Sequence, residues 1–279
     1  MPSDGYFVNR RSQHIPMTPE EFELMPRQLG WKYEYWDGQA HITPSYRFVT
    51  TAVEIKPRPV TSPCQIRAVD KNDEAQLISA YFAAFSDTIE YCDWEPEKIA
   101  AAAKKDIQDF FAGRRGKPLY SSRVAVAPQS EAGEESVVGA ALVIEKIGGQ
   151  PLLDMLFVIP EWQRKGLATA LVSAAINELY SAGMKKLESH YMLGNDESQA
   201  WHQKFGFVDE PDLFLAELYY RHAKYELWRR EKIGALTEAE REALSSEVIR
   251  WKAQVDELEK IVRRKVMGAV PRRTDGSPS

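Results

Sequence analysis

The sequence predicts a mixed α/β fold, on three observations. From residue 64 onward, short β-type runs alternate with helical patterns, which is typical of a sheet flanked by helices. The near-continuous apolar run at residues 152–159 is typical of a strand that is buried on both faces. An apolar helical pattern at residues 166–182 follows it and ends at Gly183, a residue type that commonly closes helices.

The composition of the sequence excludes several classes of protein. The 279 residues, 44% of them hydrophobic, are enough for one large domain or two smaller ones. The net charge of −5 argues against nucleic-acid binding, which needs a basic face. Two cysteines exclude a disulfide scaffold and a four-cysteine zinc site, and we expect no metal. No apolar run reaches the roughly 18 residues of a membrane span, and residues 1–11 lack a signal-peptide core. We therefore expect a soluble cytoplasmic protein with no membrane partner.

Residues 1–60 predict an N-terminal extension made of a short helix and a β-hairpin. Thr18-Pro19 is a typical helix start, a capping residue followed by proline in the first turn. Asp37-Gly38, a strong hairpin signal, lies between two strand patterns within residues 31–43. A third strand pattern covers residues 46–55. Three prolines within residues 57–63 then predict an extended connector and a domain boundary.

Residues 64–210 predict a second domain, which holds the main sheet. Its helical patterns cover residues 72–85, 93–111, 166–182 and 196–205, and its strand patterns cover residues 66–69, 121–127, 137–146, 152–159 and 185–191.

Residues 211–267 predict a helical hairpin, and residues 268–279 a disordered tail. The first helix ends at Gly234, and a capping box at Thr237 begins the second. Apolar residues of the second helix recur at alternating spacings of four and three, which predicts a coiled-coil seam. These residues are Leu244, Val248, Trp251, Val255, Leu258 and Val262. The partner is either the preceding helix or the same helix of a second copy, which would make a homodimer.

The turn at residues 159–169 carries the most chemical information. A buried strand ends at Pro160, a turn with Arg164 and Lys165 follows, and an apolar helix opens after Gly166. This order aims free backbone N–H groups and the positive end of a helix dipole at one point, an anion site suited to a pyrophosphate. The spacing matches neither the Walker-type phosphate loop nor the Rossmann glycine pattern.

Two blocks of sequence resemble the Gcn5-related N-acetyltransferase (GNAT) superfamily. In the first, Gln163, Gly166 and Ala168 form the Gln-x-x-Gly-x-Ala pattern directly after the Val158-Ile159-Pro160 strand end. The second, residues 195–207, resembles the later family motif: Asn, a small residue three positions later, then Tyr-x-Lys-x-Gly-Phe. The resemblance covers residues 64–208 and implies a GNAT-type, mainly antiparallel sheet flanked by helices.

The resemblance also implies acetyl-CoA, or another acyl-CoA, as the donor. The backbone of Phe157 and Val158 would align the pantetheine arm as an additional strand, and the turn would hold the pyrophosphate. Asn195 and Ser198 either contact the pantetheine amides or cap their helix. The residues expected to bind the cofactor are Phe157, Val158, Gln163, Arg164, Lys165, Gly166, Leu167, Ala168, Thr169, Asn195 and Ser198.

The implied reaction transfers an acetyl group to a primary amine by direct attack through a tetrahedral intermediate. Because such an amine is protonated near neutral pH, a base is useful. Asp154 is the candidate, since strand alternation puts it on one face with Leu156 and Val158; Glu145 is a weaker one. His202 stands where the family usually has tyrosine and is the candidate acid for the leaving thiolate. Tyr191 is the fallback donor.

The acceptor, a small-molecule or protein amine, would bind within residues 81–118. Aromatic residues there either line a cleft or belong to the core: Tyr81, Phe82, Phe85, Tyr91 and Trp94. Acids there either attract a cationic amine or are simply solvated: Asp87, Glu90 and Asp93. The alternative function is a catalytically silent GNAT module that binds acyl-CoA as a sensor or scaffolds a partner, because His202 replaces the usual tyrosine.

The chain departs from the family pattern after Gly206-Phe207. Family members usually finish with two strands, whereas here Glu210-Pro211 leads into a helical pattern. Either the last strand is very short or another segment replaces it. We expect the strands at residues 31–55 to complete or cover the sheet.

Overall fold

The computed structural model describes residues 11–128 and 135–268, with side chains described as far as residue 264. The helices are α1 (Pro19–Leu24), α2 (Glu74–Phe85), α3 (Pro96–Phe111), α4 (Leu167–Ser181), α5 (Asp196–Phe205), α6 (Leu213–Lys232) and α7 (Glu238–Gly268). The 3-10 turns are η1 (Lys71–Asp73), η2 (Ile89–Tyr91) and η3 (Pro160–Trp162). The strands are β1 (Gln13–Pro16), β2 (Trp31–Trp36), β3 (Gln39–Pro44), β4 (Phe48–Glu54), β5 (Gln65–Ala68), β6 (Lys117–Pro118), β7 (Arg123–Pro128), β8 (Glu135–Glu145), β9 (Pro151–Val158), β10 (Lys186–Met192) and β11 (Val208–Asp209). Gly268 ends α7, and the rest of the predicted disordered tail lies outside the described residues.

The chain divides into two compact units. Of the described residues, the first unit holds 11–15, 30–34 and 41–210, and the second holds 16–29, 35–40 and those from 211 onward. The first unit contains both sequence blocks that resemble the GNAT superfamily.

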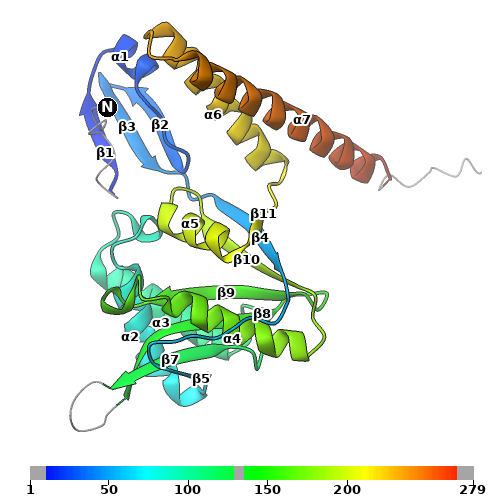
Figure 1. Cartoon of the computed structure of the whole chain (residues 1–279). Coiled ribbons are helices and arrows are strands. Elements are labelled where there is room, and N and C mark those ends of the chain that lie inside the picture. The colour runs from blue at the N-terminus through cyan, green and yellow to red at the C-terminus, as the bar shows by residue number, and fades with distance from the viewer. Residues whose placement is uncertain (1–10, 129–134, 269–279) are drawn as a thin grey trace, which may run out of the picture. The chain divides into compact units, whose positions relative to one another are not determined.

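A mixed sheet forms the centre of the first unit (Figure 1). Its strand order is β11-β4-β10-β9-β8-β7-β5, and β6 pairs with β8 beside this path. Neighbouring strands are antiparallel except for β9 and β10, which are parallel. The predicted mixed, mainly antiparallel sheet is therefore confirmed.

Strand β4 comes from the N-terminal segment but belongs to this sheet. It pairs with β10 along its whole length, from Phe48 opposite Met192 to Glu54 opposite Lys186. Its other edge pairs with β11, which is only two residues long. The expected very short last strand is therefore present as β11. Strand β4, not β11, pairs with β10. The prolines at residues 57–63 therefore do not separate the N-terminal segment from the sheet.

The hairpin expected from Asp37-Gly38 joins β2 and β3. Both turn residues have positive φ, 52° and 73°, as a two-residue hairpin turn with the right twist requires. The hairpin pairs with β1 in a separate three-stranded sheet of order β1-β3-β2. Of the three predicted N-terminal strands, only β4 joins the main sheet.

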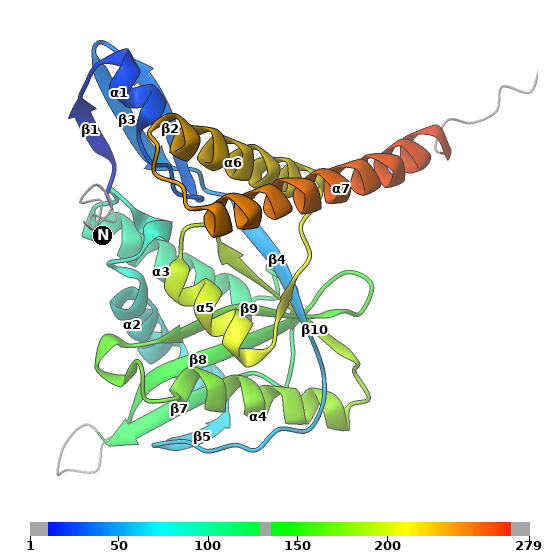
Figure 2. The ribbon, with the colours of Figure 1, turned by 45° about the horizontal axis from the view of Figure 1, so that its top comes forward.

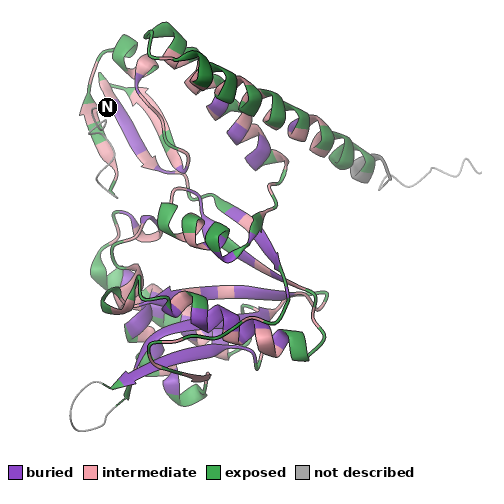
Figure 3. Cartoon of the chain, in the orientation of Figure 1, coloured by how far each residue is buried: buried purple, intermediate pink, exposed green. Residues whose placement is uncertain are grey.

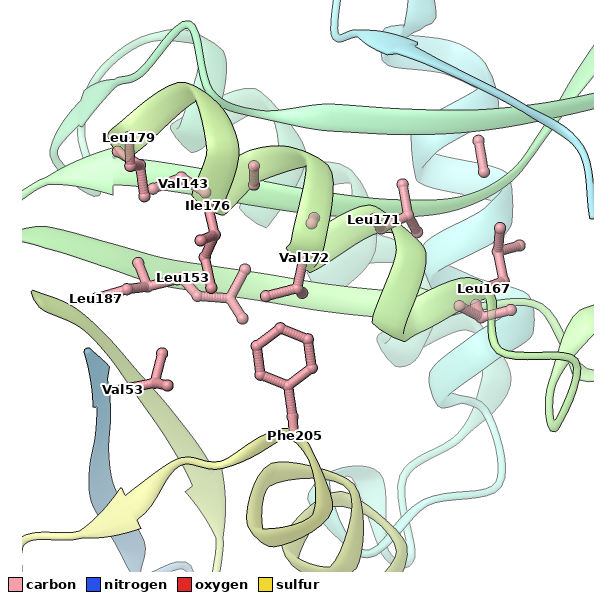
Figure 4. Close-up of a cluster of buried hydrophobic side chains, with 14 of the residues drawn as sticks. Val53, Val143, Leu153, Leu167, Leu171, Val172, Ile176, Leu179, Leu187 and Phe205 are labelled. Carbon is pink, nitrogen blue, oxygen red and sulfur yellow. The ribbon is translucent and has the colours of Figure 1, made fainter. Parts of the chain in front are cut away.

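The two faces of the main sheet bury different helices (Figure 2). One face packs against α4 and the end of α5, with Leu171, Ile176 and Phe205 over Leu153 and Leu187 (Figure 4). The opposite face packs against α2 and α3. We call them the α4 face and the α2/α3 face. Because a chemical group on one face is screened from the other by the sheet, this division decides which site residues can meet.

The second unit contains the predicted helical hairpin. Helix α7 packs along α6, where the rings of Tyr219 and Trp251 lie 4.5 Å apart and Val255 is buried. Five of the six predicted seam residues are at least partly covered, while Val262 near the end of α7 is exposed. Figure 3 shows that most of the outer surface of α7 is coloured as exposed. The preceding helix is therefore one partner of the seam.

Helix α1 also belongs to the second unit, and its start follows the predicted cap. Thr18 Oγ1 accepts a hydrogen bond from the Glu21 N–H, and the Glu21 carboxylate accepts one from the Thr18 N–H. Tyr225 of α6 donates to the carbonyl oxygen of Met25 at 2.6 Å. The same tyrosine ring lies under the Arg27 guanidinium, 4.3 Å from ring centroid to Cζ. These contacts anchor the segment after α1 to α6.

Over the described residues, no helix combines the length and the apolar character that crossing a membrane requires.

Candidate functional site

Strands β9 and β10 separate in the middle of the sheet. Their parallel pairing covers only Leu152 with Glu188 and Leu153 with Ser189. Beyond this point β10 continues with β4 and β9 continues with β8. The backbone of residues 154–158 therefore has no partner strand on the side of β10 within the described chain. This is the strand edge along which the resemblance places the pantetheine arm.

A β-bulge at Asp154 corrects the expected orientation of this residue. In the register of β8 with β9, Leu142 lies opposite Met155 and Val143 opposite Leu153, so Asp154 is the extra residue. The bulge turns Asp154 toward the α2/α3 face, whereas Leu156 and Val158 pack on the α4 face. The prediction that the three share a face is wrong, because simple alternation does not hold across a bulge.

Asp154 is held in an ion-pair network on the α2/α3 face. Its two carboxylate oxygens accept from Nε and Nη2 of Arg115, at 2.6 and 3.1 Å. Nη1 of Arg115 donates to Asp106 at 3.0 Å, and the Tyr81 hydroxyl donates to the other Asp106 oxygen at 3.3 Å. Burial alone would lower the pKa of Arg115, but its hydrogen bonds and charge pairing with Asp154 and Asp106 raise it, so the guanidinium stays charged.

The turn between β9 and α4 presents free backbone donors. Arg164 and Gly166 have φ of 61° and 80°, and Gly166 begins α4 without any side-chain cap. No N–H group of residues 164–169 donates to an acceptor elsewhere in the described chain. A Cβ at Gly166 would meet nothing within 4 Å, so the space in front of these donors is open. The turn can therefore receive an anion at the positive end of α4.

The side chains of the turn differ in their contacts and exposure. Gln163 folds back and donates from Nε2 to the carbonyl oxygen of Val158 at 3.0 Å, which ties the turn to the strand. Leu167 is buried in the core, so only its backbone faces the turn. Thr169 accepts a hydrogen bond from the Trp201 indole at 3.3 Å. Arg164 and Lys165 are exposed, and the Lys165 ammonium lies 5.0 Å from the centroid of the Trp162 ring.

Asn195 caps α5. Its Oδ1 accepts from the Ser198 N–H at 3.0 Å, and its Nδ2 donates to Glu90 at 2.8 Å. Of the two roles expected for Asn195, the helix cap is present. Ser198 Oγ lies 3.4 Å from Nδ1 of His202, so it also takes part in contacts within the protein.

His202 lies in the interior on the α4 face. Its Nε2 is 2.9 Å from Ser189 Oγ, and its Nδ1 is 2.8 Å from the carbonyl oxygen of Ser198. Nδ1 therefore carries the proton and Nε2 accepts from the serine hydroxyl. Burial lowers the pKa of the imidazole. A neutral ring with both nitrogens occupied is the environment of a structural histidine, and it does not favour the expected role as an acid.

The Tyr191 ring lies next to that of His202, with 5.2 Å between ring centroids and a tilt of 36°, and its hydroxyl donates to Asp209 at 2.8 Å. Tyr191 and His202 thus lie on the α4 face and Asp154 on the other. The structure does not bring the three predicted catalytic residues together.

The aromatic residues of the expected acceptor region form one cluster against β9. The Tyr81 ring lies 4.5 Å from that of Phe85 and 5.4 Å from that of Phe157, and its hydroxyl is 2.9 Å from the Tyr91 hydroxyl. Tyr81 is buried, and burial strongly raises the pKa of its hydroxyl. Tyr81 therefore belongs to the core, while Phe85, Tyr91 and Trp94 are only partly covered.

Sequence reasoning missed His190 and Arg115. His190 lies on β10 between the buried residues Ser189 and Tyr191, with its side chain on the α2/α3 face. Strand alternation in the run Ser-His-Tyr was a signal that could have identified it. Arg115 had no such signal, because its partner Asp154 is 39 residues away.

Part of the chain is similar to known proteins. A family model described as "Acetyltransferase (GNAT) family" matches residues 85–207. The aminoglycoside N(6')-acetyltransferase type 1 of Klebsiella aerogenes is 25% identical over 146 residues, which is 52% of this chain and 89% of that protein.

Two solved structures are also similar. A GCN5-related N-acetyltransferase from Sphaerobacter thermophilus covers 58% of this chain at 18% identity, with a TM-score of 0.41. The match spans 48% of that protein, about half its length. The PaiA N-acetyltransferase of Thermoplasma acidophilum, solved in complex with coenzyme A, covers 53% of this chain and 92% of its own at 16% identity, with a TM-score of 0.44. The match to residues 85–207 shows that this part of the chain is similar to the GNAT family of acetyltransferases.

Proposed function

We propose that the protein is an acetyl-CoA-dependent N-acetyltransferase that moves an acetyl group to a primary amine. The observation that carries the proposal is the set of free N–H groups at residues 164–169, which lies directly after the unpaired edge of β9. A diphosphate bound by these donors would direct a thioester toward the separation of β9 and β10.

The residues expected to bind the donor divide into three groups under this proposal. The backbone of Phe157 and Val158 would pair with the pantetheine amides. The backbone N–H groups from Arg164 to Thr169, with the charges of Arg164 and Lys165, would hold the diphosphate. Gln163, Asn195 and Ser198 would shape the site through their contacts within the protein.

The chemistry is attack of a neutral amine on the thioester carbonyl. An N–H group near Val158 would stabilise the negative charge that develops on the carbonyl oxygen of the tetrahedral intermediate. Asp154 was expected to act as the base, but both of its carboxylate oxygens accept from Arg115, so we propose for it an electrostatic role beside the amine instead. Tyr191 and His202 remain candidates for protonating the thiolate, although a thiol with a pKa of about 8.5 can leave without an acid.

The acceptor would be a small-molecule or protein amine of cationic character. The Klebsiella relative is named for an aminoglycoside, a polyamine, and acids from several elements lie on the α2/α3 face. We propose a cytoplasmic location for the enzyme, because its two free cysteines suit a reducing compartment. A homodimer through α7 is a further proposal, based on Ile261 and Val262, which are both exposed.

The alternative is a catalytically silent module that binds acyl-CoA as a sensor or scaffold. One observation favours it: His202 occupies the position of the family tyrosine and is buried and hydrogen-bonded on both nitrogens.

Titration calorimetry with acetyl-CoA and a CoA-release assay with a panel of amines test the proposal. Thr169→Glu places a carboxylate where the diphosphate would lie, while a negative charge in the first turn of α4 stabilises the helix itself. We expect acetyl-CoA affinity to fall at least about tenfold in this variant and to change little in the matched control Thr169→Gln. Wild-type protein that takes up no acetyl-CoA would overturn the proposal. Tight binding without CoA release on any amine would favour the silent module.

A further inference from the structure

His190 lies at the point where the sheet opens. The parallel pairing of β10 with β9 ends at Ser189, so His190 is the first residue of β10 beyond it. Its register partner on β4 is Thr50. Side chains alternate along a strand, so His190 faces the same side as Glu188 and opposite to Ser189. It therefore lies on the α2/α3 face, the face toward which the bulge turns Asp154.

The imidazole of His190 is accessible and not committed to another group. Its residue is exposed, and neither ring nitrogen has a hydrogen bond to any described residue. The other candidates differ in this respect. Both oxygens of Asp154 accept from Arg115, both nitrogens of His202 are occupied, and the Tyr191 hydroxyl donates to Asp209.

Partial burial and the nearby Lys146 ammonium favour the neutral form of the His190 ring. Burial of part of the ring lowers the pKa of His190, and the Lys146 ammonium lowers it further, while Glu188 and Asp154 oppose this effect. Lys146 is itself bound to Glu188 at 2.8 Å, and Asp154 to Arg115. Strand β4 contributes only uncharged residues next to it, Phe48, Thr50 and Ala52. A neutral imidazole near pH 7 can accept a proton.

We propose that His190 is the general base, which takes the proton from the amine as the amine attacks the thioester. This inference rests on the proposed acetyl transfer. The amine nitrogen forms a bond to the carbonyl carbon, the carbonyl π electrons move to oxygen, and one N–H proton passes to His190. The intermediate then collapses, the C–S bond breaks and the thiolate leaves; it takes up one proton from solvent to become free CoA, and His190 releases its proton to solvent. The products are the acetylated amine and CoA, and the proton of an initially protonated amine goes to solvent.

The test compares wild type and His190→Gln in kcat/KM from pH 5 to 9. For wild type we expect activity to fall on the acidic side with an apparent pKa below the ordinary value of 6.5. In His190→Gln we expect a loss of at least about 10²-fold at pH 7.5 and disappearance of that limb, with unchanged acetyl-CoA affinity. Imidazole added to His190→Ala should restore part of the rate.

A second variant gives a direct test of the assignment. Lys146→Gln removes the cation that opposes protonation of His190, so the acidic limb of the rate profile should move to higher pH. An unchanged acidic limb in both His190→Gln and Lys146→Gln, in enzyme that turns over, would overturn the role of His190 and leave the proposed function intact. Wild type that neither binds acetyl-CoA nor releases CoA would instead overturn the proposed function.

Discussion

Arg115 binds the carboxylate of Asp154 through two hydrogen bonds, from Nε to Oδ2 at 2.6 Å and from Nη2 to Oδ1 at 3.1 Å, although 39 residues separate the two in the chain. The same guanidinium also holds Asp106 of α3. One cation thus joins the bulge of β9 to α3 and sets the position of an acid at the opening between β9 and β10.

Arg115→Met should therefore destabilise the fold. It would leave Asp154, whose side chain is 9% exposed, next to Asp106 with no compensating cation. Because Arg115 is itself 32% exposed, we expect a loss in the free energy of unfolding of about 2 kcal/mol, less than for a fully buried pair. Urea denaturation measures it.

Arg114→Met is the matched control, since Arg114 is exposed and its partner Asp109 keeps Lys105. Because Arg114 is exposed and Lys105 still compensates the Asp109 carboxylate, we expect a smaller loss of stability than for Arg115→Met. Equal destabilisation by the two substitutions would contradict a special role for Arg115.

Gly166 and Gly183 form a natural pair for testing the turn. Both have positive φ, 80° and 77°, and a Cβ at either position would meet nothing within 4 Å, so alanine at either one adds the same backbone strain and no clash. We expect each alanine variant to lose about 1 kcal/mol of stability. Only Gly166→Ala should lower acetyl-CoA affinity, by about tenfold or more in calorimetry, because its added methyl group would lie in the space in front of the free amides.

If Gly183→Ala weakened acetyl-CoA binding as much as Gly166→Ala, the effect would come from general destabilisation of α4. The turn would then not be identified as the anion site.

Local signals predicted much of the fold and the turn. Asp37-Gly38 predicted a hairpin turn, and both residues have the positive φ values that such a turn requires. The helix predicted at residues 196–205 begins and ends at those residues. The turn after Pro160 leaves its amides free, as its sequence suggested. Each of these features depends on residues close together in the chain, which is why sequence reasoning could reach them.

Long-range features were beyond such reasoning. The face of Asp154 depends on the register between β8 and β9, where one extra residue reverses the alternation. The place of β4 depends on its pairing with β10, more than a hundred residues later. The burial of His202 depends on Ser189 of another element. No local pattern encodes these partners, and each of them changes the assignment of a site residue.

His202→Gln should act mainly on stability. The wild-type ring is 3% exposed and makes two hydrogen bonds, so we expect a loss of about 2 kcal/mol at pH 7.5, measured by urea denaturation. The pKa of His202 is lowered in the folded state, so the unfolded state binds the proton first as the pH falls. The stability that neutral His202 contributes is therefore present above its ordinary pKa of 6.5 and is lost as the pH falls toward the folded value.

The stability difference between wild type and His202→Gln should consequently shrink from pH 7.5 to pH 5. A difference that stays constant over this range would contradict the neutral, buried ring. A fall in kcat at unchanged stability would instead support the role of His202 as an acid.

Strand β4 should be indispensable to the main sheet. Val49 and Val53 are buried, and β4 provides the full-length antiparallel partner of β10, while β11 is only two residues long. A chain that begins at residue 61 would expose the edge of β10 and lose this burial, so we expect it to be insoluble or to lack a cooperative unfolding transition.

Val53→Asp, which puts a charge into the α4-face core, should lower the stability of the full-length chain by at least about 3 kcal/mol. Glu54→Gln, at the exposed neighbouring position, is the control and should change stability by less than about 0.5 kcal/mol. A soluble truncated chain that releases CoA as fast as the full-length protein would show that the sheet closes without β4.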